Sequence, residues 1–221
     1  MTPAYGFCLT ARLSLEPIGP RHADDLVRLH QDPVVATWVA GPWSTAEAGE
    51  FAESAQRGWA NDGVHKWIAY RRSDGALVGR GGLSRMPVDA PTTVQIASLT
   101  EGTDWSSSRL EVGWSLLGDF RGQGYATEIG REGLRFAHSA FSAESVIAFT
   151  ERHNLASRKV MERLDMRYVG EIAARGLVEG RTGEFDDAPF AVHLKTLTTS
   201  TDRAADSQLG PCPMSGLRSD R

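Results

Sequence analysis

A short loop rich in glycine carries the clearest chemistry in this sequence. Residues 121–126 read Arg-Gly-Gln-Gly-Tyr-Ala and stand directly before a long helical pattern. Two glycines and a small alanine let several main-chain N–H groups converge on one point, which is also the positive end of the helix. The loop therefore predicts an anion-binding cradle, with phosphate as its natural ligand.

A tight strand-to-helix connection that uses glycine for its geometry alone is the alternative interpretation of this loop. Two better-known phosphate loops are excluded by the residues themselves. The Lys-Ser/Thr ending of the nucleoside-triphosphatase loop is missing, and the three-glycine dinucleotide pattern is not met.

The elements on either side of the loop must position it. Residues 110–117 are rich in β-formers and bounded by turn residues, so they predict a strand. From Ala126 onward the spacing of apolar residues predicts an amphipathic helix. Its apolar positions are Ala126, Ile129, Gly130, Gly133, Leu134, Ala137 and Phe141.

The loop closely resembles motif A of the GNAT superfamily of acyl-CoA-dependent N-acetyltransferases, whose pattern is Arg/Gln-x-x-Gly-x-Gly/Ala. Residues 125–128, Tyr-Ala-Thr-Glu, resemble the start of this helix in the branch typified by ribosomal-protein N-terminal (alanine/serine) acetyltransferases. The resemblance extends with decreasing strength from about Ala11 to Leu197. It implies an α/β (α+β) GNAT fold, in which helices flank a mixed, mostly antiparallel sheet whose parallel central strands splay apart. We expect residues 8–198 to form this domain and the polar residues 199–221 to be a disordered tail.

The resemblance also implies acetyl-CoA (coenzyme A) as the acyl donor, with its pyrophosphate on the loop and its pantetheine arm along residues 112–117. In the family a bulge is expected at Gly113, whereas a glycine that serves packing in an ordinary strand is the alternative. The cofactor-binding residues expected on this basis are Trp114, Ser115, Leu116, Leu117, Arg121, Gly122, Gln123, Gly124, Tyr125, Ala126, Thr127, Asn154 and Ser157.

Two catalytic residues follow from the resemblance. Glu111 stands where several family members place a glutamate that takes the proton of the amine; a carboxylate on the strand surface is the alternative. The helix after residues 145–150 lacks the tyrosine that many relatives place near the thiolate. Asn154-x-x-Ser157 instead matches a pattern of the ribosomal-protein branch, in which the serine lies near the sulfur. A local hydrogen bond of Ser157 in the first helical turn is the alternative.

The acceptor site is the least defined part of this picture. We expect Trp38, Trp43 and Glu111 to bind the acceptor amine, together with the hairpin over residues 171–187. This hairpin has more acidic than basic residues, so it could attract a cationic amine, although an ordinary solvated loop is the alternative.

The remaining elements fit a single α/β domain. Strands are expected at residues 10–17, 66–71, 76–83, 145–150, 166–172 and 189–197, and helices at residues 22–31, from Ser44 onward and from Asn154 to Leu164. Residues 86–108 are an insertion of the kind that is usually functional or mobile, with a short strand as one option at residues 93–99.

Composition narrows the function classes. The net charge of −4 over 221 residues argues against nucleic acid as a partner. No apolar run approaches the length of a membrane span, and the first residues lack the order of a secretory signal, so we expect a cytoplasmic location. The six histidines show no ligand-type pairing, so no metal is expected. The sequence leaves a homodimer open.

These features together predict an enzyme that acetylates a primary amine by direct attack in a ternary complex. The acceptor is a protein N-terminus or a small molecule. Two rivals remain: an acyltransferase that uses another acyl-CoA or a small amine such as an antibiotic or polyamine, and a CoA-binding sensor without catalysis.

Overall fold

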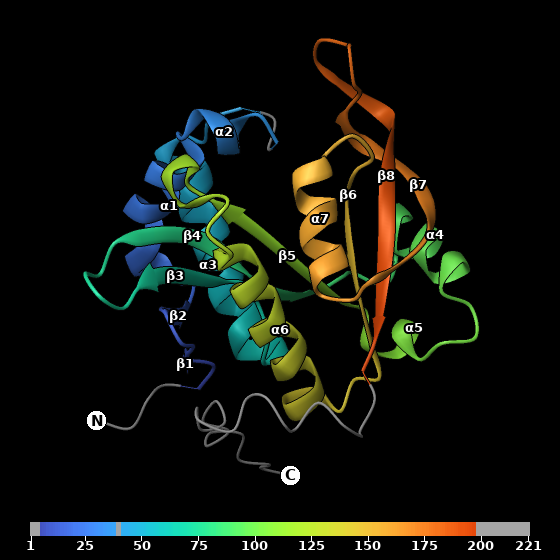
Figure 1. The fold of residues 1–221 in the computed structure, drawn as a ribbon, viewed down its shortest axis with the longest axis horizontal. Coiled ribbons are helices and arrows are strands. Elements are labelled where there is room, and N and C mark those ends of the chain that lie inside the picture. The colour runs from blue at the N-terminus through green and yellow to red at the C-terminus, as the bar shows by residue number, and fades with distance from the viewer. Residues whose placement is uncertain (1–4, 39–40, 198–221) are drawn as a thin grey trace.

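The computed structural model describes residues 5–38 and 41–197. One eight-stranded sheet, with the order β1-β2-β3-β4-β5-β6-β8-β7, runs through this part of the chain (Figure 1). Its strands are β1 (Cys8–Leu9), β2 (Leu13–Pro17), β3 (Trp67–Arg71), β4 (Leu77–Arg85), β5 (Leu110–Leu116), β6 (Ser145–Glu151), β7 (Arg167–Leu177) and β8 (Glu184–Thr196).

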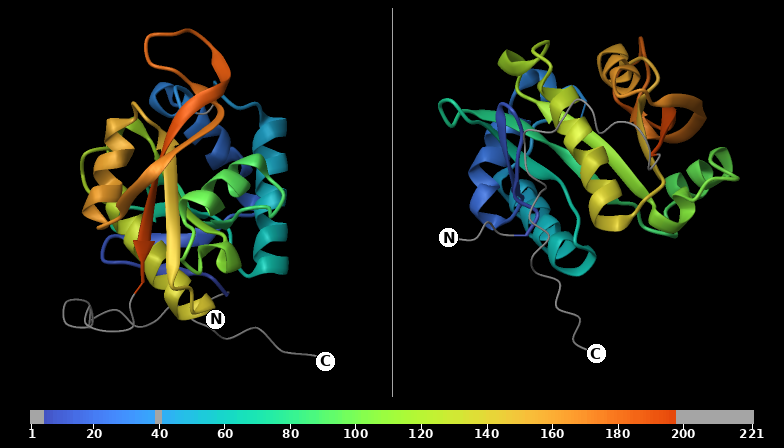
Figure 2. Two further views of the ribbon diagram at one scale, coloured as in Figure 1. Left: turned by 90° about the vertical axis from the view of Figure 1, so that its right-hand side faces the viewer. Right: turned by 60° about the horizontal axis from the view of Figure 1, so that its bottom comes forward.

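Helices cover both faces of the sheet. They are α1 (Ala23–His30), α2 (Pro33–Ala36), α3 (Thr45–Asp62), α4 (Pro91–Leu99), α5 (Trp105–Ser108), α6 (Tyr125–Phe141) and α7 (Leu155–Arg163), with 3₁₀ turns η1 (Pro20–His22) and η2 (Gly118–Phe120). The left view of Figure 2 separates α6 and α7 on one side of the strands from α3, α4 and α5 on the other. None of the helices within the described ranges combines the length and apolar character needed to cross a bilayer.

Local sequence explains where the longest helix begins and ends. Ser44 caps α3, since its hydroxyl accepts from the amide of Glu47 at 3.2 Å. The Glu47 carboxylate in turn accepts from the amide of Ser44 at 2.7 Å, which completes a capping box. The helix ends at Asp62 and is capped by Gly63, whose φ of +68° favours glycine.

Three apolar clusters fill the space between sheet and helices. The largest lies under α6 and includes Trp67, Val112 and Phe136. A second cluster joins α1 and α3 to Ile68 of β3, and a third joins α4 and α5 to Ile147 of β6. Neighbouring strand residues point to opposite faces, so Trp67 and Ile68 place the first two clusters on opposite sides of the sheet. The second and third clusters remain separate from each other.

The centre of the sheet opens between β5 and β6. These are its only parallel neighbours in the described ranges, and their pairing is confined to Glu111 opposite Ile147. All other recorded strand pairs are antiparallel. The predicted mixed, mostly antiparallel sheet with parallel central strands that separate is therefore confirmed.

Three details differ from the sequence predictions. The optional strand at residues 93–99 is wrong: Pro91 starts helix α4, and helical spacing buries Thr93 and Ile96. The insertion joins the core, since Ile96 and Trp105 are fully buried. The expected bulge is also wrong, because β4 pairs with β5 in continuous register through Gly113.

The last hairpin is longer than the apolar pattern indicates. Strands β7 and β8 extend to Leu177 and from Glu184, so the connecting turn is shorter than the predicted polar region. Backbone hydrogen bonds to the neighbouring strand maintain the pairing where the side chains are polar and exposed. The predicted tail, residues 199–221, lies outside the described residues.

Candidate active site

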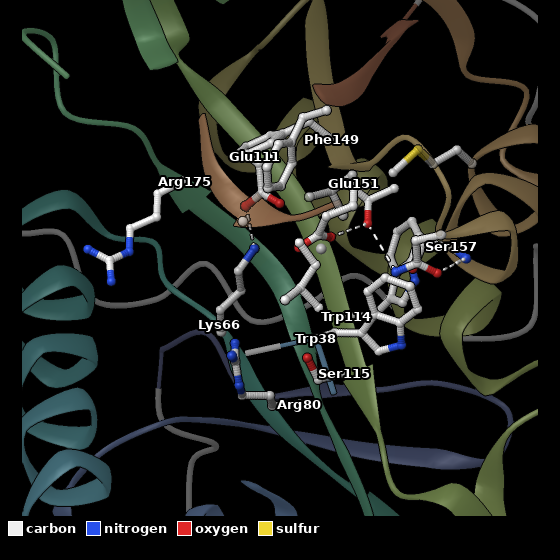
Figure 3. A pocket seen from close by; sticks show the side chains of 18 of the residues that line it. Trp38, Lys66, Arg80, Glu111, Trp114, Ser115, Phe149, Glu151, Ser157 and Arg175 are labelled. Atoms are coloured by element: carbon white, nitrogen blue, oxygen red, sulfur yellow. Dashed lines mark hydrogen bonds and ion pairs between the residues drawn. The ribbon is translucent and has the colours of Figure 1, made fainter. Parts of the chain in front are cut away.

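A cavity of about 370 Å³ lies where β5 and β6 separate. Glu111, Trp114 and Ser115 of β5 line it, together with Ser157 of α7 and Trp38 after α2. Figure 3 shows these side chains around one space, with Glu111 and Ser157 contributed by different elements. The structure thus brings together both predicted catalytic residues, which are far apart in the sequence.

Glu111 belongs to a largely buried ion pair. Its Oε2 accepts hydrogen bonds from the Nζ of Lys66 at 2.6 Å and from the hydroxyl of Ser84 at 2.9 Å. The side chains of Glu111 and Lys66 are only 13% and 10% exposed. Burial lowers the pKa of Lys66, while the neighbouring Glu111 carboxylate opposes this change. Neither of these hydrogen bonds involves the other carboxylate oxygen of Glu111, Oε1.

Space for this carboxylate explains the glycine in the middle of β5. A Cβ on Gly113 would lie 2.6 Å from Oε1 of Glu111 and 3.3 Å from Nζ of Lys66. The first distance is shorter than real Cβ contacts allow. Glycine at this position therefore leaves room for the Glu111–Lys66 pair.

Ser157 and Asn154 occupy the start of α7. The side chain of Asn154 accepts from the amide of Ser157 at 3.2 Å and donates to the hydroxyl of Thr150 at 3.1 Å. Asn154 is thus the helix cap that the sequence predicts. Ser157 therefore forms a local hydrogen bond through its amide, whereas its hydroxyl has no hydrogen-bond partner among the described residues. Both residues line the cavity.

The glycine loop has the geometry of an open anion cradle. Gly122 and Gly124 adopt left-handed backbones with φ of +74° and +85°, and Gly124 precedes the first residue of α6. No side-chain hydrogen bond caps this helix within the described chain. The amides at its positive end are therefore available to a ligand.

Arg12 lies beside this loop and was missed in the sequence. Its Nη1 donates to the carbonyl of Gln123 at 3.0 Å, and it forms a 2.7 Å ion pair with Glu128. Its guanidinium lies 4.2 Å from the ring centre of Tyr125. Arg12 thus places a guanidinium next to the cradle, with its charge balanced by Glu128 in the first turn of α6. The hydroxyl of Thr127, in the first turn of α6, is buried without a partner among the described residues. The open amides, Arg12 and this hydroxyl fit the diphosphate end of a CoA molecule.

The predicted cofactor residues of β5 divide into two groups. Trp114 and Ser115 line the cavity, whereas Leu116 packs in the cluster under α6 and Leu117 in the cluster of α1 and α3. The amide of Leu117 donates to the carbonyl oxygen of Val78 at 3.1 Å. On its other side, β5 has no recorded pairing with β6 beyond Glu111, so its backbone edge is open toward the cavity.

The predicted acceptor residues also divide. Trp38 lines the cavity and lies against His153, with 5.2 Å between ring centres. Trp43 lies outside the lining and stacks on His30, with ring centres 3.4 Å apart. The hairpin contributes Arg175 and Glu184 to the cavity, which form an ion pair of 2.9 Å with each other.

Three further charged residues of the cavity were not recognised in the sequence. Lys66 directly precedes β3, Arg80 lies in β4, and Glu151 ends β6. Burial raises the pKa of Glu151, to which the hydroxyl of Thr150 donates at 3.3 Å. Arg80 interrupts an otherwise uncharged run, Leu-Val-Gly-Arg-Gly-Gly-Leu, and this was the available signal. Within the described residues, no group of three potential metal-ligating side chains was found.

Comparison with known proteins agrees with this architecture. The acetyltransferase (GNAT) domain family matches residues 12–167. The FsC-acetyl coenzyme A-N(2)-transacetylase of Aspergillus fumigatus is 32% identical over 163 residues, which are 72% of this chain. The match spans 64% of the length of that relative.

Two solved structures share the fold. A putative GNAT-family acetyltransferase from Bordetella pertussis has a TM-score of 0.66 at 18% identity, over 86% of this chain and 99% of its own. A putative ribosomal-protein-serine acetyltransferase from Vibrio cholerae has a TM-score of 0.62 at 18% identity, over 89% of this chain and 100% of its own. At this identity they inform the fold alone, whereas the family match covers most of the sequence. The chain therefore belongs to the GNAT acetyltransferase family.

Proposed function

We propose that this protein transfers an acetyl group from acetyl-CoA to a primary amine, by direct attack in a ternary complex. The observation that carries the proposal is the cavity at the separated strands, which holds Glu111 and Ser157 and adjoins the open edge of β5. A protein N-terminus and a small amine both remain candidates for the acceptor.

The cofactor would be held at two places. The amides around Gly122 and Gly124, with Arg12 and Arg121 nearby, would bind the diphosphate. The open edge of β5 at Trp114 and Ser115 would pair with the pantetheine amides. When bound, acetyl-CoA supplies an activated acetyl thioester.

Glu111 would act as the general base. Lys66 and Ser84 both hold Oε2, which fixes the carboxylate and leaves Oε1 to take a proton from the amine. Ser157 would donate its free hydroxyl to the departing sulfur, since this hydroxyl has no competing partner in the described chain. A positioned donor of this kind stabilises charge that develops during the reaction.

Cofactor binding is tested by Gly124→Glu, which places bulk and negative charge in the cradle. Gly102→Glu is the matched control, because Gly102 has nearly the same φ, +83°, with nothing within 4 Å of an added Cβ. We expect calorimetry to detect no CoA binding for Gly124→Glu and normal binding for Gly102→Glu. Equal affinity of both variants for CoA would contradict the role of the loop.

The catalytic roles are tested by release of free CoA thiol over a panel of acyl donors and amines. Glu111→Gln should lower kcat by at least about 100-fold and change the pH profile, because general base catalysis is worth about 10²–10⁴ in rate. Glu151→Gln makes the same change elsewhere in the cavity and should have a smaller effect. The opposite order would assign the base to Glu151. Tight CoA binding without turnover of any amine would favour a sensor.

A further inference from the structure

Arg80 places a largely buried positive charge in the cavity without an anionic partner. In the described chain no carboxylate lies within ion-pair distance of its guanidinium, and its recorded hydrogen bond goes from Nε to Nε2 of His30, at 3.0 Å. Burial lowers the pKa of Arg80 to about 10, an effect that Glu111 opposes. Arginine nevertheless stays charged at neutral pH, and an unpaired charge in such a place is costly.

The surroundings of Arg80 hold its side chain in one orientation. His30 is fully buried and stacked on Trp43, and burial lowers the pKa of His30 to about 3, so its neutral ring can accept from Nε. The guanidinium carbon also lies 4.8 Å from the ring centre of Phe51. With Nε engaged, the two terminal nitrogens remain as a fork for a ligand in the cavity.

The other cations of the cavity are already paired. Lys66 is bound to Glu111 and Arg175 to Glu184. Figure 3 shows the guanidinium of Arg80 near the stem of Lys66, on the same side of the cavity. Arg80 is therefore the lining residue that attracts an anion most strongly.

Strand register relates Arg80 to the proposed base. Arg80 lies opposite Ser115, and Ser84 lies opposite Glu111, with Gly82 opposite Gly113 between them. Residues directly opposite each other point to the same face, so Arg80 and Glu111 share one side of the sheet. Their Cα atoms are about 13 Å apart along the strands. Both side chains are long, so their charged groups can lie closer together than their Cα atoms. The Lys66 ammonium lies over this glycine pair, since its Nζ donates to the carbonyl of Gly82 at 2.9 Å and would lie 3.3 Å from a Cβ on Gly113.

We propose that Arg80 binds a carboxylate of the acceptor, so that the substrates are amines that also carry a carboxylate, as amino acids do. The inference rests on the proposed function and specifies the chemical class of the acceptor. A forked guanidinium and a carboxylate form two parallel hydrogen bonds, which would orient the amine toward Oε1 of Glu111. Simple amines lack this contact.

The test compares each common amino acid, β-alanine and γ-aminobutyrate with its own carboxamide, in the thiol-release assay with acetyl-CoA. We expect at least one acid to exceed its amide in kcat/KM by about 30-fold or more, as expected for a buried charged hydrogen bond. In Arg80→Met the ratio should fall to within about threefold of one. Arg152→Met removes the same charge from an exposed position outside the cavity lining and should keep the ratio.

The other possible outcomes overturn either the inference or the proposed function. Equal use of acids and amides by the wild type, or CoA binding without turnover of either, overturns the inference. A preference for succinyl-CoA over acetyl-CoA with neutral amines, lost in Arg80→Met, places the carboxylate on the acyl group and also overturns it. If neither the wild type nor the variants bind CoA, the proposed function itself fails. Should Arg80→Met not fold, the wild-type ratio and Arg80→Lys, which keeps the charge without the fork, decide the question.

Discussion

Gly113→Ala should damage catalysis far more than folding. The added Cβ would lie 2.6 Å from Oε1 of Glu111, so the carboxylate must retreat by at least about 0.4 Å to reach 3.0 Å. Lys66 and Ser84 hold the other oxygen and resist this movement. A misplacement of about 1 Å can cost about 100-fold in rate, so we expect kcat/KM to fall by about 10- to 100-fold.

The expected change in stability is small because two effects oppose each other. Gly113 lies outside the left-handed region, so alanine gains about 0.4–1 kcal/mol from the less flexible unfolded chain. Strain against Glu111 offsets this gain. Thiol release measures activity, denaturant unfolding measures stability, and Gly49→Ala, where an added Cβ meets nothing within 4 Å, calibrates the glycine effect. Wild-type kcat/KM in Gly113→Ala would refute both the spatial argument and the role of Glu111.

Three further predictions concern the helix start, a strained turn and acid stability. Ser157→Ala should lower kcat by about 10- to 100-fold at unchanged CoA affinity, and an unchanged kcat would exclude its role at the sulfur. Asp165→Gly should raise the free energy of unfolding by about 1 kcal/mol in denaturant titrations, because Asp165 has a φ of +54° and its ion pair with Lys195 is exposed and 3.7 Å long. His30 has a pKa of about 3 when folded, below its ordinary 6.5, so its neutral form stabilises the fold above pH 6.5. This stability should be lost as the pH falls from 6.5 toward 3, by up to about 1.4 kcal/mol per unit, and His30→Gln should flatten the slope measured by unfolding at each pH.

The loop and its helix could be predicted because their signals are local. Gly122 and Gly124 are needed for left-handed backbones, and the helical spacing after Ala126 matches the buried face of α6. The start of α7 is equally local, since Asn154 caps the amide of Ser157 three residues later. Such features depend on a few neighbouring residues, and a sequence displays them directly.

The charged centre of the site could not be predicted in the same way. Lys66 and Glu111 are separated by 45 residues, and their contact depends on the register of β3, β4 and β5. The insertion was misjudged for a related reason. Its prolines, serines and threonines are typical of a loop, yet Ile96 and Trp105 are buried against strands that come later in the chain. Tertiary packing decided both cases.

The position of the charges follows from the way the sheet is covered. The cluster of α1 and α3 and the cluster of α4 and α5 are separate, since Leu77 of β4 belongs to the first and Met86, directly after β4, to the second. Arg80 of β4 lies between these two residues in the sequence, and Glu111 of the neighbouring β5 is paired with Lys66. Apolar side chains at these positions would give more stability than charges that are removed from water. Two of these charges compensate each other, and the third has no partner within the described chain. A fold that retains an uncompensated charge beside an open strand edge is organised for a ligand that supplies the missing anion.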